Sequence, residues 1–315
     1  LIQVQYDIKI LSRHSKHIAF FDIARISIPI QERLIFPILK RIIESAMSLW
    51  YNPIKQTGIL WRCKGMEILE FGDRNKRKII FIHGFQCPYQ IWDRYIEHYK
   101  MDFHIVVPIM PGHNPKQKED FISFSKTAKE LEDYCISRYG EKVYAVYGMS
   151  MGGVLAATLW QDNRFEIEKV IFDGSPLVSV NGIIKKLMVR FYLNITHKSQ
   201  QRDKKTLEQA VKSIIAPEYL NNFLEVLDNM SDTTIVNCIN DIADFRLQDN
   251  IATKNTKIYF FHGTAANEML AKKSAKFISK NYSNCVVKCF EGKSHCENAL
   301  FQPELMIKEL DKVLK

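Results

Sequence analysis

The sequence lacks several features that would settle its class at once. It has no run of about 18 apolar residues, the length that spans a bilayer, and its N-terminus shows no signal-peptide cleavage pattern. Its seven cysteines are an odd number, and none stands in a C-x-x-C pair typical of zinc sites. No Gly-rich loop ends in Lys-Ser or Lys-Thr, as a phosphate-binding loop would. We therefore expect a cytoplasmic protein with free thiols, no metal and no cofactor.

Low-complexity segments are also missing, and 46% of the 315 residues are hydrophobic, enough for one large core. The formal net charge of +9 comes from lysines and arginines scattered over many segments. The longest basic clusters, at 74–78 and 202–205, are short and have no aromatic-basic nucleic-acid module around them. The charge therefore indicates a basic solvated surface and no nucleic-acid partner.

Residues 1–57 differ from the rest and are expected to form an N-terminal helical extension. Between Ile28 and Ile43 the large apolar residues recur at helical spacing, with basic residues between them. We favour docking of this helix onto the domain or onto a partner subunit. Weak contact of residues 1–50 with a membrane surface is the alternative.

From about residue 58 the pattern alternates between strands and helices. The expected strands are 65–72, 77–84, 103–110, 142–148, 168–173, 257–262 and 286–290, and the expected helices are 89–99, 124–139, 152–161 and 304–314. Apolar strands that alternate with helices predict an α/β fold, a mostly parallel sheet with helices on both faces. In the last strand, Cys285 and Cys289 flank an apolar pair and are expected to be buried thiols.

Between residues 176 and 254 this alternation stops and the pattern becomes helical throughout, with candidate helices at 207–215, 217–230 and 233–245. We expect a helical cap at 176–254, inserted into a core formed by 58–175 and 255–315. The apolar residues of the cap, some of which could face a site, are Ile183, Ile184, Leu187, Met188, Phe191, Leu220, Phe223, Leu224 and Leu227.

The strongest chemical signal is Gly148-Met149-Ser150-Met151-Gly152, which follows an apolar strand and precedes a helix. Such a turn is so tight that only glycine leaves room two residues before and after the serine. The hydroxyl of Ser150 would stand above the sheet edge. The N-terminus of the following helix would favour negative charge, as an oxyanion requires. Ser150 is therefore the candidate nucleophile.

The order of His83-Gly84-Phe85, Pro111-Gly112-His113 and this serine turn resembles the α/β-hydrolase superfamily over residues 58–315. The resemblance implies an α/β-hydrolase fold with an oxyanion hole formed by the backbone N–H groups of Phe85 and Met151. It also implies that His83 braces the turn and is not a base.

The same family places its catalytic histidine in the loop after the last strand, and Gly292-Lys-Ser-His295 stands there. The usual acid position holds Ala266, which departs from the pattern. Glu268, two residues later in the same loop, is our favoured acid. Asp173, at the end of an earlier strand, is the alternative, and a dyad without an acid, or some other acid, also stays open.

The resemblance implies a serine hydrolase that cleaves a small carboxylic ester or related acyl substrate through an acyl-enzyme intermediate. The apolar cap favours an acyl chain, on composition alone. An acyltransferase would use the same residues. A non-catalytic hydrolase-fold protein that binds a ligand is a further alternative, suggested by the irregular acid loop. The oligomeric state does not follow from the sequence.

Overall fold

A computed structural model of the protein describes residues 59–63, 66–251 and 256–315. The N-terminal helical extension expected at 1–57, and the membrane contact considered for residues 1–50, lie outside the described residues.

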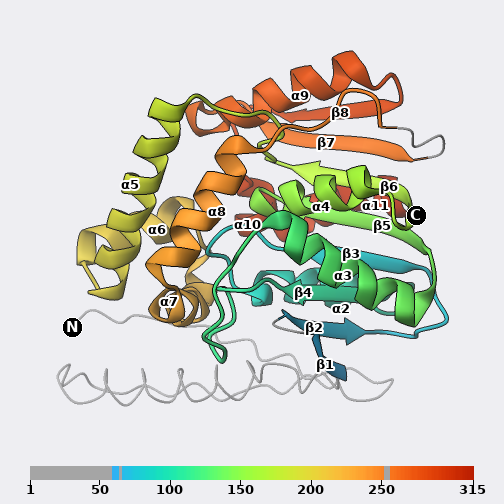
Figure 1. Ribbon diagram of the computed structural model, residues 1–315, viewed down its shortest axis with the longest axis horizontal. Coiled ribbons are helices and arrows are strands. Elements are labelled where there is room, and N and C mark those ends of the chain that lie inside the picture. The colour runs from blue at the N-terminus through green and yellow to red at the C-terminus, as the bar shows by residue number, and fades with distance from the viewer. Residues whose placement is uncertain (1–58, 64–65, 252–255) are drawn as a thin grey trace, which may run out of the picture. The chain divides into compact units, whose positions relative to one another are not determined.

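The described residues form one sheet of eight strands in the order β1-β2-β4-β3-β5-β6-β7-β8 (Figure 1). The strands are β1 (Ile59–Cys63), β2 (Met66–Phe71), β3 (Lys78–Ile82), β4 (His104–Ile109), β5 (Lys142–Met149), β6 (Glu166–Asp173), β7 (Lys257–Gly263) and β8 (Cys285–Phe290). The β1–β2 and β2–β4 pairs are antiparallel and all others are parallel. The seven expected strands and the mostly parallel sheet are confirmed. β1 was not expected; it adds an antiparallel edge.

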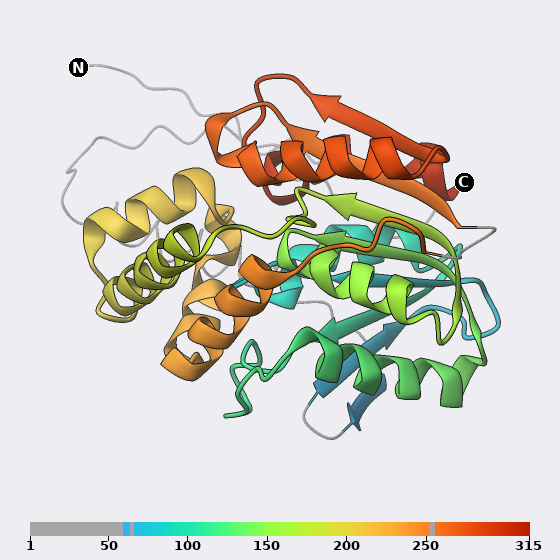
Figure 2. The ribbon, with the colours of Figure 1, turned by 45° about the horizontal axis from the view of Figure 1, so that its top comes forward.

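Helices cover both faces of the sheet (Figures 1 and 2). Those outside the cap segment are η1 (Tyr89–Trp92), α2 (Asp93–Tyr99), α3 (Phe124–Tyr139), α4 (Met151–Asp162), η3 (Ala266–Glu268), α9 (Met269–Asn281), α10 (Glu297–Phe301) and α11 (Pro303–Leu314). One apolar core joins the sheet to α3, α4 and α9, and a second joins its other face to α2 and α11. This two-sided burial explains why the central strands are almost uninterrupted apolar runs.

The edge strand β8 departs from that rule. Cys289 is exposed and Cys285 is half-buried, so the expectation that both thiols are buried is wrong. Val286 is also exposed. β8 is an edge strand with a sheet neighbour on one side only, so apolar residues in its sequence do not indicate that these residues are buried.

The helices of the expected cap segment all fall between β6 and β7 and gather beside one end of the sheet (Figures 1 and 2). They are α5 (Gly182–Gln200), α6 (Lys204–Ser213), η2 (Pro217–Tyr219), α7 (Leu220–Asn229) and α8 (Asp232–Asp244). The first and longest, α5, was not among the candidate helices. It begins where the Asn181 side chain accepts a hydrogen bond from the backbone N–H of Ile184, a normal N-cap.

The apolar residues of these helices divide into two groups. Phe223 and Leu227 are buried in the core shared with α2 and α11. Those on α5 behave differently, since Ile183, Leu187 and Phe191 are exposed to solvent. These three residues are therefore not part of the core, and the expectation that some apolar residues of this segment face a site stays a prediction.

Candidate active site

Ser150 lies in a strained turn between β5 and α4. Its φ is 52° and its ψ is −117°, a conformation that side-chain-bearing residues rarely adopt. A Cβ on Gly148 would lie 2.4 Å from the carbonyl oxygen of Gly152, and a Cβ on Gly152 would lie 2.3 Å from that of Ile82. These approaches confirm that the turn needs glycine on both sides of the serine. Ser150 is half-buried.

Hydrogen bonds hold both the serine turn and the turn that follows β3, which carries His83 and Gly84. The backbone N–H of Ser150 donates to the carbonyl of Asp173 at the end of β6, at 2.7 Å. His83, at the end of β3, donates from Nδ1 to the carbonyl of Gly84 (2.9 Å) and accepts the N–H of Met110 at Nε2 (3.2 Å). Burial lowers the pKa of His83 to about 4, so the ring is neutral. Since both ring nitrogens are engaged, the expected bracing role is confirmed.

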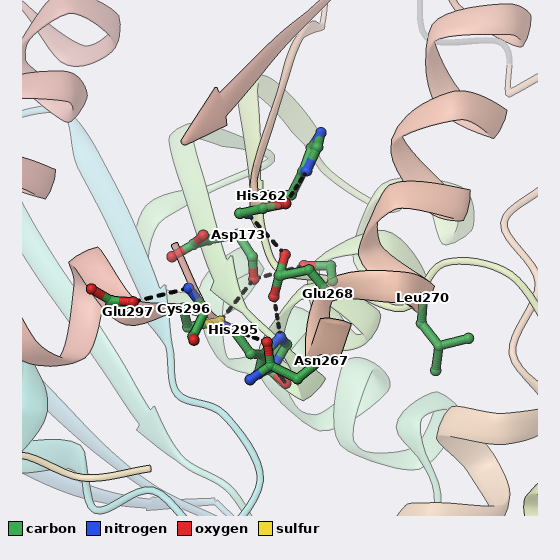
Figure 3. A network of polar contacts seen from close by, with 12 residues as sticks. Asp173, His262, Asn267, Glu268, Leu270, His295, Cys296 and Glu297 are labelled. Atoms are coloured by element: carbon green, nitrogen blue, oxygen red, sulfur yellow. Dashed lines mark hydrogen bonds and ion pairs between the residues drawn. The ribbon is translucent and has the colours of Figure 1, made fainter. Parts of the chain in front are cut away.

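His295 lies in the loop that follows β8, and its ring reaches Ser150. Its Nε2 lies 2.8 Å from Oγ of Ser150, and its Nδ1 lies 2.5 Å from Oε1 of Glu268. With the ring proton on Nδ1, the serine hydroxyl donates to Nε2 and Nδ1–H donates to the carboxylate. Figure 3 shows Glu268 between the end of β7 and the His295 ring. The three side chains come from three loops at the carboxyl edge of the parallel strands.

Glu268 is held rigidly in that position. It ends the short helix η3, which fills the loop between β7 and α9, and its side chain is fully buried. Its second oxygen, Oε2, accepts the backbone N–H of Gly263 at 3.0 Å. Beside it, Oδ1 of Asn267 accepts the N–H of His295 at 3.3 Å. The η3 turn thus brings an acid two residues beyond the usual position to the histidine.

Asp173, the alternative acid, lies at the end of β6, where its carboxylate accepts the hydroxyl of Tyr147 at 2.7 Å. Burial raises the pKa of Asp173 to about 7, with the nearby charge of Glu268 acting in the same direction, while the Tyr147 hydrogen bond and His295 oppose the shift. In the described residues, the only carboxylate hydrogen-bonded to the His295 ring is that of Glu268. Of the two candidates, Glu268 contacts the histidine ring, while Asp173 contacts Tyr147.

The two expected oxyanion donors lie on the loops around Ser150. Met151 is the first residue of α4, whose initial N–H groups lack partners within the helix. Among the residues that the structure describes, no acceptor pairs with the backbone N–H of Met151 or of Phe85. Both groups are thus free to bind a negatively charged oxygen, and their role as an oxyanion hole stays a prediction.

Phe85 also marks the contact between the core and α5. Its ring packs edge-on against Tyr192 of α5, with centroids 5.2 Å apart, and against His113 at 5.7 Å. The next residue, Gln86, donates from Nε2 to Oγ1 of Thr196 on the same helix at 2.6 Å. Helix α5 is therefore fastened to the loop that carries one expected oxyanion donor.

Sequence reasoning missed four of these residues. Asn267 accepts the backbone N–H of His295, Tyr147 donates to Asp173, and Gln86 and Thr196 join the loop after β3 to α5. Asn267 stands beside Glu268 in the chain, a signal that could have been used. The others are separated from their partners by 26 to 110 positions and carry no local pattern.

No group of three or more His, Cys, Asp or Glu side chains in the described part of the chain could hold a metal ion. Within the same residues, no helix is both long enough and apolar enough to cross a membrane. The cytoplasmic location expected from the sequence stays a prediction.

Comparison with known proteins identifies the fold. No protein-family model matches the sequence, and neither does any curated protein. Solved structures do match. An α/β hydrolase family protein from Desulfitobacterium hafniense aligns with a TM-score of 0.63 at 16% identity, over 79% of this chain and 100% of its own.

Two further structures are a carboxylesterase from Nitrososphaera gargenis and the esterase EaEST from Exiguobacterium antarcticum. The first has a TM-score of 0.64 at 14% identity, over 81% of this chain and 97% of its own. The second has 0.63 at 16% identity, over 82% and 99%. At such low identity the likeness establishes the fold alone, which agrees with the resemblance found in the sequence.

Proposed function

We propose that this chain, which has the α/β-hydrolase fold, is a serine hydrolase that cleaves a carboxylic ester or related acyl substrate. The observation that carries the proposal is the continuous chain of contacts from Ser150 through His295 to Glu268, at 2.8 and 2.5 Å. A nucleophile, a base within hydrogen-bond reach and a group that orients the base are the parts that acyl transfer needs. A buried histidine or a structural turn would not require this combination.

In the first step, Oγ of Ser150 attacks the carbonyl carbon while Nε2 of His295 accepts the hydroxyl proton. The negative charge moves onto the carbonyl oxygen, where the N–H groups of Phe85 and Met151 stabilise it. The C–O bond to the alcohol then breaks, and the leaving oxygen takes the proton from Nε2. The products of this step are the free alcohol and an acyl ester on Ser150.

In the second step, water attacks the acyl carbon and gives a proton to Nε2 of His295. The bond between this carbon and Oγ breaks, and Oγ takes the proton back. A carboxylic acid leaves, and the enzyme returns to its first state. During both steps the buried carboxylate of Glu268 holds Nδ1–H and stabilises the positive charge on the ring.

Fold alone does not decide between reactions, because one fold supports many chemistries. Structures that share this fold include esterases, but also an epoxide hydrolase and a bromoperoxidase. The contact of His295 with a serine favours acyl transfer among these. An acyltransferase would differ only in the acceptor that replaces water. The irregular acid loop was the reason to consider a non-catalytic ligand-binding protein. That reason is weakened because Glu268 hydrogen-bonds the histidine.

A panel of p-nitrophenyl esters of increasing acyl length tests the proposal, with the wild type compared with Ser150→Ala. We expect the wild type to release p-nitrophenol and free acid, and Ser150→Ala to lose about six orders of magnitude in kcat while remaining folded. Product analysis with an added alcohol separates hydrolysis from transfer. Equal turnover by the two proteins would refute the proposal.

A further inference from the structure

The outward face of helix α5 is unusually apolar for a solvent-exposed surface. Of the ten large hydrophobic side chains exposed in the described part of the chain, four lie on this one helix. Ile183, Leu187 and Phe191 are 74%, 59% and 57% exposed, and Ile184 is 37% exposed. The other six are spread over five separate segments. A cluster of this kind marks an interaction surface more often than isolated exposed residues do.

The spacing places these side chains side by side. Residues four apart on a helix lie on one face, so Ile183, Leu187 and Phe191 form a stripe about 80° wide, with Ile184 at its border. The opposite face of α5 packs inward through Tyr192 and the buried Thr196. The helix therefore has one face that the fold uses and one apolar face that no described residue covers.

Basic side chains border this stripe on one side. Lys186 and Arg190 are exposed, and no carboxylate of the described residues lies within 4.0 Å of either. Helices α5 and α6, residues 182–213, contain eight lysines and arginines against two acidic residues. Residues 217–244, which form η2, α7 and α8, contain six acidic residues and no basic one. The positive charge of the cap is thus concentrated on its α5–α6 half.

We propose that the outward face of α5 docks on an anionic lipid bilayer. An interfacial helix needs a stripe of Leu, Ile or Phe that enters the boundary between headgroups and acyl chains, and adjacent cations for the anionic headgroups. Ile183, Leu187 and Phe191 supply the first part, and Lys186 and Arg190 supply the second. A nucleic acid would use the cations but not the aliphatic stripe. A second copy of this face would bring two positively charged helix pairs together.

Docking would bring the bilayer close to the site. The inner side of α5 contacts Phe85 through Tyr192 and Gln86 through Thr196, so the lipid surface would lie roughly one helix diameter, about 10 Å, from that loop. If the proposed function holds, the acyl substrate can come from the bilayer itself. The docking does not depend on that function, because it rests on the surface of α5 alone.

Co-sedimentation of the 315-residue chain with phosphatidylcholine vesicles, with and without phosphatidylglycerol, tests the proposal without any turnover. We expect binding only with phosphatidylglycerol, weakening as salt is added. Reversing both charges in Lys186→Glu/Arg190→Glu should weaken partitioning at least about 30-fold, because each basic residue near an anionic surface contributes about fivefold. Leu187→Ser/Phe191→Ser should weaken it at least about tenfold at every salt concentration.

The matched controls change exposed residues of the same types elsewhere. Lys280→Glu/Lys308→Glu, on α9 and α11, reverses the same charge, and Met101→Ser with Leu305→Ser removes apolar surface. If the α5 face is responsible for binding, both control proteins should bind the vesicles within about threefold of the wild type. Binding through the overall positive charge of the protein would instead be weakened in the charge-reversal control. Equal losses in the α5 and control variants, or no loss in either, would overturn the proposal. The proposal would also be overturned if the protein formed a concentration-dependent dimer that only the α5 variants lose. The same holds if it bound duplex DNA but not vesicles and only the α5 variants lost that binding.

Discussion

Replacing Glu268 by glutamine keeps the size of the side chain but removes the negative charge beside His295. In the wild type this carboxylate lies 2.5 Å from Nδ1 of the ring and is fully buried, while the His295 side chain is 34% exposed, so water screens the pair only in part. In the proposed mechanism the ring takes up a positive charge when Ser150 gives its proton to Nε2. Glu268 therefore stabilises a charge that develops after substrate has bound, and its loss should slow the chemical step.

The size of the effect follows from the geometry. Two unit charges whose centres lie about 4 Å apart interact by about 4 kcal/mol at an effective dielectric constant of about 20. Since about 1.4 kcal/mol corresponds to a factor of ten in rate, Glu268→Gln should lower kcat about 1000-fold. KM should hardly change, because the lost interaction is absent from the substrate complex.

Steady-state kinetics with a p-nitrophenyl ester measures this prediction, and Asp173→Asn is the matched control. It neutralises a second buried carboxyl of the same site, one that contacts Tyr147 and not the histidine. We expect Asp173→Asn to stay within about tenfold of the wild type. The reasoning is refuted if the order is reversed, with Asp173→Asn losing about 1000-fold and Glu268→Gln remaining active.

Three further predictions concern stability. The pKa of Asp173 in the folded protein is raised to about 7, so its contribution to stability is complete below about pH 4 and is lost as the pH rises to 7. The free energy of unfolding measured with urea should therefore fall by up to about 4 kcal/mol over this range, and Asp173→Asn should lack this fall. Gly152→Ala forces a Cβ against the Ile82 carbonyl and should cost about 3 kcal/mol or more; an unchanged melting temperature would contradict this. Gln86→Ala removes the buried bond to Thr196 and should lower the free energy of unfolding by about 1–3 kcal/mol, while an exposed change such as Gln209→Ala should not.

The serine turn could be predicted because all its requirements are local. A strand, a tight turn and a helix occupy consecutive residues, and the close approaches that exclude side chains at Gly148 and Gly152 arise within that unit and its neighbouring strand. The parallel core was predictable for a similar reason, since burial on both faces gives each central strand a continuous apolar run. At the edge strand β8 this logic fails, and so the burial of Cys289 was predicted wrongly.

The acid could be narrowed to two residues but not chosen from the sequence. Glu268 and Asp173 both end up at the carboxyl edge of neighbouring strands, where either is near enough to influence the histidine. Which one contacts the ring depends on the path of the β7–α9 loop. The short helix η3 in this loop places the Glu268 side chain against the histidine. Such a loop path is set by contacts across the fold, which no local pattern records.

Helix α5 shows a different limit. Helical spacing indicates that a face of α5 is apolar, but it does not say whether that face meets the core, the site or the solvent. The inner face is fixed by Tyr192 and Thr196, whose partners lie more than 100 positions away in the chain. The exposure of the apolar stripe of Ile183, Leu187 and Phe191 could therefore not be predicted from the spacing alone.

The most direct test of the account is whether Ser150 is an activated nucleophile. Treating the protein with a fluorophosphonate probe and mapping the adduct by peptide mass spectrometry answers this without knowledge of the substrate. The account predicts one adduct, on Ser150, that is absent from Ser150→Ala and forms far more slowly in His295→Ala. An unlabelled Ser150 in the folded protein, or equally fast labelling without the histidine, would contradict it.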